Sequence, residues 1–481
     1  MFSHVHLLEK IRLSQVIAIT VLAFISYACV EERTPAKPNI LFILADDQCY
    51  QTIAELGNPE VITPTLDELA RQGTVFTTAY NMGGWNGAIC VASRTMFQTG
   101  RFLWRAHEAE SRLRVLAEEN RLWSKEMESL GYDTYMTGKW HVKIDPSEVF
   151  HHVGTVRGGM PDDTPEGYNR PLSEDDWEWT PWDTSFGGFW QGGTHWSEVV
   201  ASETMAFLDS TATSENPFFM YVAFNAPHDP RQSPREYVDM YPLENISVPE
   251  SYLAEYPYKE AIGCGPELRD EMLAPFPRTE YAVKVHRQEY YAIITHMDAQ
   301  IRRILWKLEQ TGQAGNTYIF FSADHGLSVG HHGLIGKQNM YDHSLRPPMI
   351  VAGPGIPKGE KRDMAVYLQD IMPTVIEYAG GEIPPYVEFH SLKPLIEGSR
   401  PDSFYPQVYG AYMDLQRMIR KDNYKLIVYP RANVRRLFNL SSDPGEIHDL
   451  ASEPDQQKRV ESMFRELQGL QGVMGDTLDL L

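Results

Sequence analysis

The feature that most constrains this chain is a series of apolar segments, each of which stops at a polar cluster. A continuous apolar run is typical of a strand buried on both faces of a sheet. Runs of this kind occupy residues 39–44, 132–136, 218–224 and 317–322. The clusters that follow them contain Asp46-Asp47, Lys139-Trp140-His141, His228 and Asp324-His325. Segments with helical patterns separate these runs.

One of these helical segments carries clear start and stop signals. Thr63 is placed as an N-cap, Pro64 occupies the first helical position, and Gly73 ends the apolar pattern. A further strand is predicted over 75–80, and a second helix over 290–312. The alternation predicts an α/β fold, with a large, mostly parallel or mixed sheet flanked by helices on both faces. Ligands bind beyond the carboxyl ends of strands in such sheets, and that is where the polar clusters fall.

The pattern changes near residue 384. Shorter segments and a helix predicted over 454–470 indicate a smaller C-terminal α+β subdomain at 384–481, after a larger α/β domain at 38–383. The segment 151–196 reads as a long loop, and loops of this length are usually functional. Its five tryptophans would suit stacking on sugar rings or packing in a core. They are Trp177, Trp179, Trp182, Trp190 and Trp196.

The N-terminus reads as an export signal over residues 1–29. Lys10 and Arg12 precede an apolar run at 16–28, which is shorter than the ~20 residues that span a bilayer. Ser26-Tyr27-Ala28-Cys29 resembles a bacterial lipobox, so we expect Cys29 to be lipidated and residues 30–37 to form a tether. The predicted location is outside the cytoplasm of a bacterium, either periplasmic or anchored to the outer membrane.

Charge excludes one class of partner. The formal net charge is −22, from 43 Lys+Arg and 65 Asp+Glu, whereas a nucleic-acid binder needs a basic surface. Nucleic acid is therefore not an expected partner, and membrane contact is expected only through the lipid anchor. Cys49 and Cys264 form a disulfide or remain two free thiols; both alternatives stay open.

The acidic strand ends predict a metal site. Asp46 and Asp47 would repel each other at a buried strand end unless a cation neutralised them. Asp324 ends another strand, so three carboxylates gather at one edge of the sheet. We expect Ca²⁺, and Mg²⁺ less so, because oxygen ligands suit hard cations and the protein is exported. His325 either ligates the ion or contacts the substrate, since imidazole suits softer metals.

The most specific motif is Cys90-Val91-Ala92-Ser93-Arg94, followed by Thr99-Gly100-Arg101. A helix predicted to begin near Ser93 places Cys90 at its positive end. The thiol is then either a nucleophile or a buried structural cysteine. Together with Gly138-Lys139-Trp140-His141, the motif resembles that of type I sulfatases in the alkaline-phosphatase-like superfamily. The resemblance extends from residue 39 to the motifs at 437–446.

This resemblance implies a sulfuric ester hydrolase whose Cys90 is oxidised by a sulfatase-maturing enzyme. That family's maturases recognise C-x-[P/A]-x-R and convert the cysteine to formylglycine; Ala92 stands where many members have Pro. The hydrated aldehyde attacks sulfur and later releases sulfate, which a plain Cys, Ser or Thr could not do. The implied catalytic residues are Cys90, Arg94, Lys139, His141, His228 and Lys337. The implied metal ligands are Asp46, Asp47, position 90, Asp324 and His325.

The resemblance also implies individual roles. Arg94 holds the hydrated aldehyde, and Lys139 and His141 contact this hydrate and the sulfate. His228 and Lys337 lie on the sulfate and leaving-group side.

The substrate class is less constrained. The resemblance favours a sulfated poly- or oligosaccharide. Four residues near the motifs are predicted substrate contacts: Trp104, His107, Asp229 and Arg231. The alternatives are a phosphodiesterase or phosphonate monoester hydrolase with the same nucleophile, a choline or aryl sulfatase, and an inactive, surface-anchored glycan-binding lipoprotein.

Overall fold

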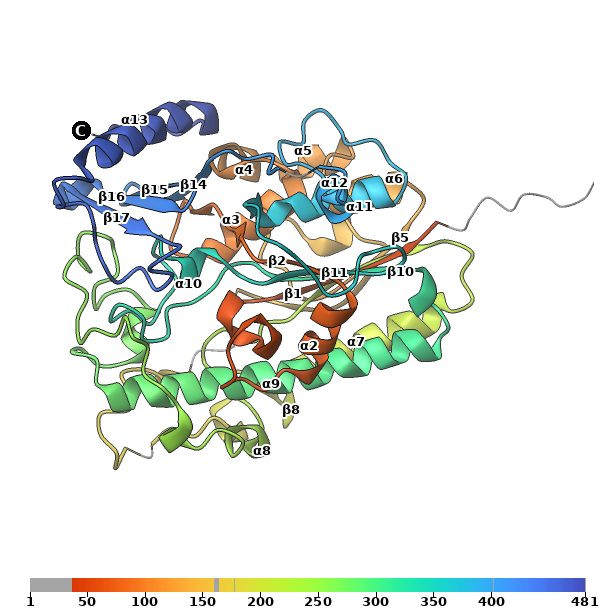
Figure 1. Cartoon of the computed structure of the whole chain (residues 1–481). Helices are drawn as coiled ribbons and strands as arrows, with labels where there is room; N and C mark the ends of the chain where they lie inside the picture. The colour runs from red at the N-terminus through yellow and green to blue at the C-terminus, as the bar shows by residue number, and fades with distance from the viewer. Residues whose placement is uncertain (1–36, 160–163, 177, 401, 481) are drawn as a thin grey trace, which may run out of the picture. The chain divides into compact units, whose positions relative to one another are not determined.

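An eight-stranded mixed sheet runs through the centre of the protein (Figure 1). The structure is a computed structural model that describes residues 37–159, 164–176, 178–400 and 402–480. The strand order is β12-β2-β11-β10-β1-β9-β5-β6. The predicted export signal and Cys29 lie outside the described residues, so both remain predictions.

The large sheet is parallel in its middle and mixed at one side. β10, β1, β9, β5 and β6 pair in parallel, whereas β11 pairs antiparallel with both β10 and β2. The strands are β1 Asn39–Ala45, β2 Thr74–Phe76, β5 Asp133–Lys139, β6 His152–Arg157, β9 Phe218–Ala223, β10 Thr317–Ala323, β11 Met349–Ala352 and β12 Glu360–Arg362. The predicted α/β class is therefore confirmed.

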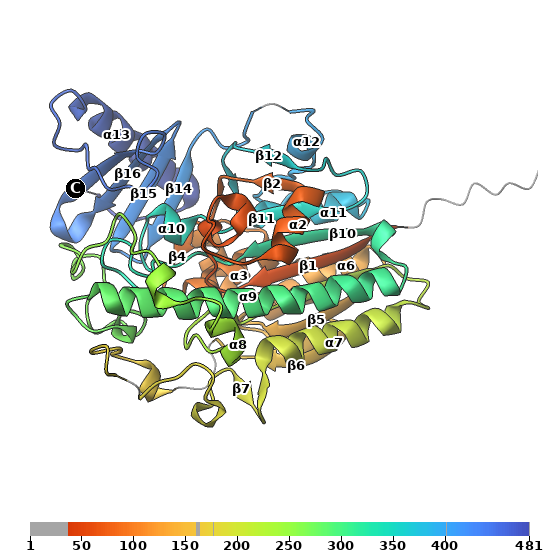
Figure 2. The same cartoon turned by 60° about the horizontal axis from the view of Figure 1, so that its bottom comes forward.

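Helices cover both faces of this sheet (Figures 1 and 2). On one side lie α2 Pro64–Gln72, α7 Trp196–Thr211 and α9 Glu280–Gln310. On the other lie α3 Ile89–Thr99, α5 Leu113–Glu118, α6 Trp123–Ser129, α11 Ile371–Tyr378 and α12 Lys393–Ile396. The remaining helices are α4 Leu103–Glu110, α8 Arg235–Val238, α10 Asp342–Leu345 and α13 Gln457–Met474. No described helix meets the length and apolarity that a bilayer crossing demands.

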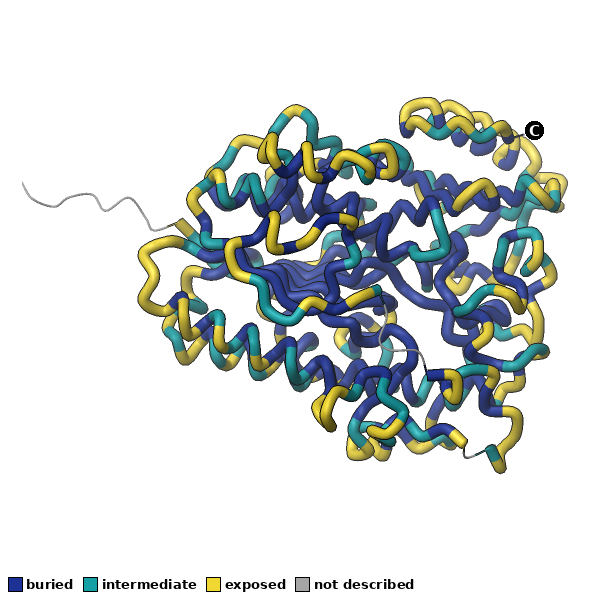
Figure 3. Tube along the Cα trace, turned by 180° about the vertical axis from the view of Figure 1, so that it is seen from behind, coloured by how far each residue is buried: buried dark blue, intermediate teal, exposed yellow. Residues whose placement is uncertain are grey.

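The alternation of side chains along β1 explains the two layers. Leu41 and Ile43 pack in the core that contains α2, α7 and α9, whereas Phe42 and Leu44 pack in the core that contains α3, α5, α6 and α11. All seven residues of the strand are buried, because successive side chains point to opposite faces and both faces are covered. The interior strands accordingly appear dark blue in Figure 3.

A second, five-stranded sheet lies towards the C-terminus, in the order β17-β16-β15-β14-β4. Its strands are β4 Gly83–Gly84, β14 Val408–Tyr412, β15 Gln416–Lys421, β16 Tyr424–Tyr429 and β17 Val434–Asn439. Val460, Phe464 and Leu467 of α13 belong to the same apolar core as this sheet. The short strands and α13 match the α+β structure predicted for this segment, while the domain boundary between residues 383 and 384 stays a prediction.

Several element bounds differ from the sequence prediction. The strand predicted over 75–80 is two short strands, because β2 joins the large sheet while β3 (Ala79–Tyr80) pairs with β13 (Val366–Tyr367). α9 begins at Glu280 rather than near 290. Thr279 caps this start, because its side chain accepts a hydrogen bond from the Ala282 backbone N–H. The segment 151–196 is not all loop, since β6 extends the sheet, and β7 (Trp190–Gln191) pairs with β8 (Thr194–His195).

The chain segment just before the Cys90 motif joins the five-stranded sheet as its edge strand β4. β4 pairs in parallel with β14, in the register Gly83 to Ala411. Gly83 has φ +90°, and a Cβ added there would lie 2.0 Å from the Ala411 carbonyl oxygen. Only glycine fits this position, because a side chain would be strained and would also clash with backbone. The loop that leads into α3 is thereby fixed to the C-terminal sheet.

This junction predicts a strong effect of Gly83→Ala. We expect the free energy of unfolding to fall by roughly 3 kcal/mol or more, because the variant adds strain in a left-handed backbone conformation and overpacks the junction. A fall in melting temperature measures this loss. Gly131→Ala is the matched control, since Gly131 has φ +85° with nothing within 4 Å of the added Cβ, and should cost about 1 kcal/mol. An equal fall in melting temperature in the two variants would contradict the close approach of Gly83 to the Ala411 backbone.

Candidate active site

The acidic residues meet at the carboxyl ends of two neighbouring strands. β1 and β10 pair in the register Ala45 to Ala323, so Asp46-Asp47 and Asp324 emerge side by side. The Asp47 backbone N–H donates to Asp324 Oδ1 at 3.3 Å, and Asp47 adopts φ +70°. All three carboxylates are completely buried. The structure thus brings together the predicted cluster.

Cys90 lies in the first turn of α3. The helix begins at Ile89 rather than near Ser93, and its N-cap residue Ala88 makes no side-chain cap. The N-terminal end of a helix favours negative charge. Cys90 Sγ lies 3.1 Å from His141 Nδ1. Burial raises the pKa of Cys90, but Lys139, His141 and His325 outweigh it and bring the pKa well below the usual range. Cys90 is therefore set up for negative charge.

Arg94 lies one helical turn after Cys90 and joins α3 to two strand ends. Its Nε donates to Asp324 Oδ2 at 2.9 Å, and its NH1 donates to the Lys139 carbonyl at 2.6 Å. The side chain is completely buried. A buried guanidinium needs such fixed partners, because an unpaired charge there would be costly. Arg94 thus sets the position of Cys90 relative to Asp324.

Lys139 and His141 come from the end of β5. The Lys139 ammonium contacts Asp46 Oδ2. His141 adopts φ +54°, and its ring packs against Gly159, where an added Cβ would lie 2.4 Å from the ring Cε1. The missing side chain at 159 thus makes room for the imidazole beside Cys90.

His228 and Lys337 approach from the other side of the cluster. Lys337 Nζ lies 3.0 and 2.9 Å from the two oxygens of Asp47, and His228 Nε2 lies 3.9 Å from Asp47 Oδ2. Burial opposes charge on Lys337, yet Asp47 and Asp270 raise its pKa well above the ordinary value. Burial and Lys337 lower the pKa of His228. Lys337 is therefore cationic and His228 neutral.

The buried ligand atoms fit a divalent cation. One oxygen each of Asp46 and Asp324, Cys90 Sγ and one nitrogen of His325 all lie within 4.8 Å of one another. Asp46 Oδ1 is buried without a hydrogen-bond partner among the described residues. Burial and then Asp324 raise the pKa of Asp46, as expected for acidic groups packed together.

His325 faces the same cluster. Its Nδ1 lies 2.9 Å from the Gly326 carbonyl and its Nε2 lies 3.0 Å from Asp47 Oδ1. Burial opposes protonation, but Asp47 and Asp324 raise its pKa to about 10. The hydrogen bond at Nδ1 leaves Nε2 as the nitrogen that would ligate an ion, and a bound cation would take the place of the Nε2 proton.

A cavity of about 450 Å³ opens onto Cys90. It is lined by Gly87, Ala88, Cys90, His141, Gly159, His228, Leu268, Arg269, Asp270, Lys337 and Gln338. Arg269 and Asp270 were not predicted from the sequence. They lie in an irregular segment between α8 and α9, and no strand end, spacing or motif distinguishes them.

The four predicted substrate contacts lie outside the lining of this cavity. Trp104 Nε1 donates to the Tyr409 hydroxyl at 2.9 Å, and the His107 ring stacks on Trp85 with centroids 4.9 Å apart. Arg231 is buried, with NH1 3.0 Å from His286 Nδ1. Asp229 is buried beneath His228 and Arg269. Arg231 contacts His286 in this structure, and substrate contact by these four residues stays a prediction.

Two of the five tryptophans in the 151–196 segment pack inward, whereas Trp182 and Trp190 are only partly buried. Trp179 is buried, donates to Glu289 Oε1 at 3.2 Å and lies under Arg170. Trp196 is buried beneath the Arg157 guanidinium. Trp177 lies outside the described residues. For Trp179 and Trp196 the core alternative therefore holds.

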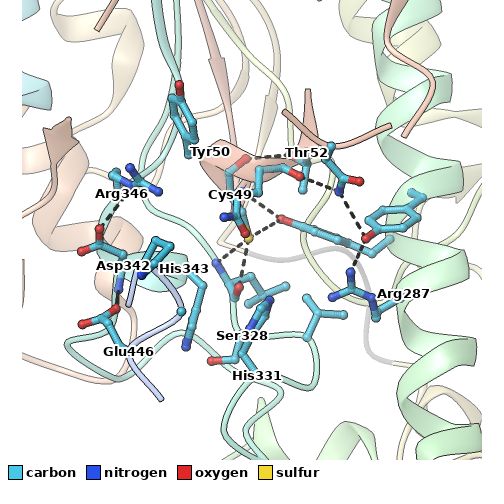
Figure 4. A pocket seen from close by; sticks show the side chains of 18 residues that line it. Cys49, Tyr50, Thr52, Arg287, Ser328, His331, Asp342, His343, Arg346 and Glu446 are labelled. Carbon is cyan, nitrogen blue, oxygen red and sulfur yellow. Dashed lines mark hydrogen bonds and ion pairs between the residues drawn. The ribbon is translucent and has the colours of Figure 1, made fainter. Parts of the chain in front are cut away.

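Cys49 and Cys264 are two free, buried thiols. Cys49 Sγ donates to the Leu327 carbonyl at 3.0 Å, and Cys264 Sγ donates to the Gln338 carbonyl at 3.2 Å. Cys49 lines a small, separate cavity of about 70 Å³ (Figure 4). His331 and His343 also line it, and their rings stack 5.0 Å apart. The free-thiol alternative is the one that the structure adopts.

Comparison with known proteins identifies the family. The sequence model of the Sulfatase family matches residues 38–381, and that of the C-terminal part of N-sulphoglucosamine sulphohydrolase matches residues 330–472. The chain belongs to the sulfatase family. It is therefore a sulfuric ester hydrolase.

Individual relatives cover nearly the whole chain. It is 28% identical to an arylsulfatase of Clostridium perfringens, over 90% of this chain and 95% of the relative. A protein solved in complex with its substrate D-glucosamine-2-N,6-O-disulfate has a TM-score of 0.69 and 21% identity, covering 92% of this chain and 99% of that one. The phosphonate monoester hydrolase of Silicibacter pomeroyi has a TM-score of 0.70 and 20% identity, with coverages of 92% and 96%. At these identities the structures establish the shared fold.

The ligand cluster predicts that divalent cations stabilise the protein. Adding Ca²⁺ should raise the melting temperature and chelation should lower it, since a ligand at 100 times its Kd stabilises by about 2.7 kcal/mol. Asp324→Asn should abolish this response. Asp298→Asn is the control, because Asp298 is a buried carboxylate that binds the Thr65 and Leu66 N–H groups instead. A full cation response in Asp324→Asn would contradict the assignment.

Proposed function

We propose that the protein hydrolyses sulfate esters of a poly- or oligosaccharide, with the nucleophile formed from Cys90. The observation that carries the proposal is the placement of Cys90 Sγ, 3.1 Å from His141 Nδ1 and within the ligand cluster of Asp46, Asp324 and His325. The C-x-A-x-R motif supports oxidation of this residue by a sulfatase-maturing enzyme. The hydrate of the resulting formylglycine supplies one hydroxyl to attack sulfur and a second to release sulfate.

Asp46, Asp47, Asp324 and His325 are the proposed protein ligands of Ca²⁺, with Mg²⁺ as the less favoured ion. A cation held by these residues would lower the pKa of the attacking hydroxyl and offset charge on the sulfate oxygens. Arg94 keeps position 90 beside the ligands through its bonds to Asp324 and to the Lys139 carbonyl. Burial of these groups strengthens their electrostatic effect.

Lys139 and His141 serve the nucleophile side. The Lys139 ammonium lies in the buried cluster, where it faces sulfate oxygens and stabilises their charge. His141 Nδ1 is within reach of position 90, which places it to remove the second hydroxyl's proton as sulfate departs. Lys139 is the last residue of β5 and His141 follows it by two residues, so the backbone at the end of this strand fixes the distance between them.

The departing alcohol requires a proton, and Lys337 is the favoured donor. His228 Nδ1 lies 2.7 Å from the Asp229 carbonyl oxygen, so this nitrogen carries the proton of the neutral ring. Nε2 of the neutral ring then has only a lone pair to offer. Lys337 is cationic and can transfer a proton to the leaving oxygen, while His228 faces the same leaving-group side, where its Nε2 can accept a hydrogen bond from a substrate hydroxyl.

A saccharide substrate is supported by a structural relative, the protein solved with D-glucosamine-2-N,6-O-disulfate. A phosphonate monoester hydrolase or phosphodiesterase is the second candidate, because the Silicibacter pomeroyi enzyme shares the fold. Choline sulfate and aryl sulfates are further candidate substrates within the sulfatase class. The motif at residues 1–29 supports export, with Cys29 as the proposed lipid anchor in the periplasm or outer membrane.

Modification of Cys90 is directly testable. Mass spectrometry of the Cys90 peptide from the native host should show the aldehyde in place of the thiol. Cys90→Ala should abolish turnover and leave the melting temperature within a few degrees of the wild type. Cys264→Ala is the control, since this thiol is also buried but lies outside the ligand cluster. An unmodified thiol in active protein would contradict the proposed nucleophile.

The substrate class is tested with matched esters. We expect faster turnover of a sugar 6-sulfate than of the corresponding 6-phosphate, and faster turnover of the sugar sulfate than of choline sulfate. Initial rates of alcohol release at equal concentration provide the measurement. Preferred cleavage of the phosphate ester would favour the second candidate, and preferred cleavage of choline sulfate would exclude the saccharide.

A further inference from the structure

Arg269 lies at the wall of the catalytic cavity, above two buried carboxylates. Its side chain is 35% exposed, whereas those of Asp229 and Asp270 are 3% and 4% exposed. Arg269 NH1 lies 3.1 Å from Asp229 Oδ2, and its NH2 contacts Asp270 Oδ1. One guanidinium therefore bridges two acidic groups that would otherwise repel each other.

Each carboxylate also contacts one of the groups proposed to face the leaving oxygen. Asp229 Oδ1 lies 3.2 Å from His228 Nδ1. Asp270 Oδ2 lies 3.8 Å from Lys337 Nζ and accepts a 2.8 Å hydrogen bond from Gln338 Nε2. The result is a continuous sequence of contacts from His228 through Asp229, Arg269 and Asp270 to Lys337.

The loop that carries Arg269 is fixed to the loop that carries Lys337. The buried Glu271 carboxylate accepts hydrogen bonds from the backbone N–H groups of Ile335 and Gly336, at 3.0 and 2.9 Å. Glu271 also pairs with the buried Arg278 guanidinium. Because the backbone around Arg269 is held in this way, its guanidinium has a defined position relative to Lys337.

We infer that Arg269 is a positioning residue that sets the placement of His228 and Lys337 through Asp229 and Asp270. The inference rests on the proposed function, in which His228 and Lys337 face the departing oxygen. Without the guanidinium, two buried carboxylates lose their shared cation, which is costly. Asp229 would then shift relative to His228, and Asp270 would draw Lys337 away from Asp47. Proton delivery to the leaving group would become slow.

The test compares two sulfate esters that differ in their need for a proton. An alkyl sulfate has a poor leaving group that requires protonation, whereas 4-nitrophenolate departs unprotonated. Misplacing a general acid costs about 10²–10⁴-fold, so Arg269→Gln should lower kcat/KM for the alkyl sulfate by about 100-fold or more. The loss for 4-nitrophenyl sulfate should stay below about tenfold. Arg269→Lys should lose less kcat/KM for the alkyl sulfate than Arg269→Gln does, but should not match the wild type, because an ammonium cannot bridge both carboxylates as a guanidinium does.

Arg105→Gln is the matched control, since Arg105 is 27% exposed and pairs with Glu388 away from the cavity. It should leave the ratio of the two activities unchanged. Equal losses on both esters in the Arg269 variants, or no loss, would overturn the inference. Turnover of 4-nitrophenyl sulfate also shows that the active site of a variant is folded. If Arg269→Gln unfolds, Arg269→Lys provides the comparison of the two esters. The alkyl sulfate used is a sugar 6-sulfate, so failure of the wild type to cleave it would instead contradict the proposed function.

Discussion

The parallel pairing of β1 with β10 is the constraint on which the catalytic edge depends. It places Asp46, Asp47 and Asp324 together, out of contact with water. Three buried carboxylates are stable only with compensating charge, because each loses its hydration. The fold supplies this charge from three elements: Arg94 from α3, Lys139 from the end of β5 and Lys337 from the loop after β10. The positions of the cationic side chains therefore follow from the positions of the acidic ones.

Much of this arrangement could be predicted from the sequence. The 39–44 run became β1, and the Thr63-Pro64 start with the Gly73 stop delimited α2 as expected. Residues that follow parallel strands share one edge of the sheet, so strand-end motifs predict proximity without a structure. The same signal explains why Lys139 and His228 were found along with the carboxylates.

The parts of the fold and site that could not be predicted depend on tertiary contacts, which local sequence patterns do not reveal. The start of α3 was misplaced because Ala88 has no capping side chain, so Ser93 gave the only visible signal. Arg269 and Asp270 come from an irregular loop that takes its place from the contacts of Glu271 with Ile335 and Gly336. Proximity in sequence also does not fix the contacts of a side chain: Arg231 is three residues from His228, and its side chain contacts His286 and Tyr290.

The pairing of β4 with β14 bears on the order of events during synthesis. Cys90 is only 2% exposed in the finished fold, and the segment that precedes it is held by a strand that begins at Val408. An enzyme that modified Cys90 by binding its motif as an extended peptide would therefore have to act before Val408 is made and docked. At ~5–20 residues per second of synthesis, this interval lasts tens of seconds. The late position of β14 in the chain thus gives the Cys90 motif a period of accessibility that closes as folding is completed.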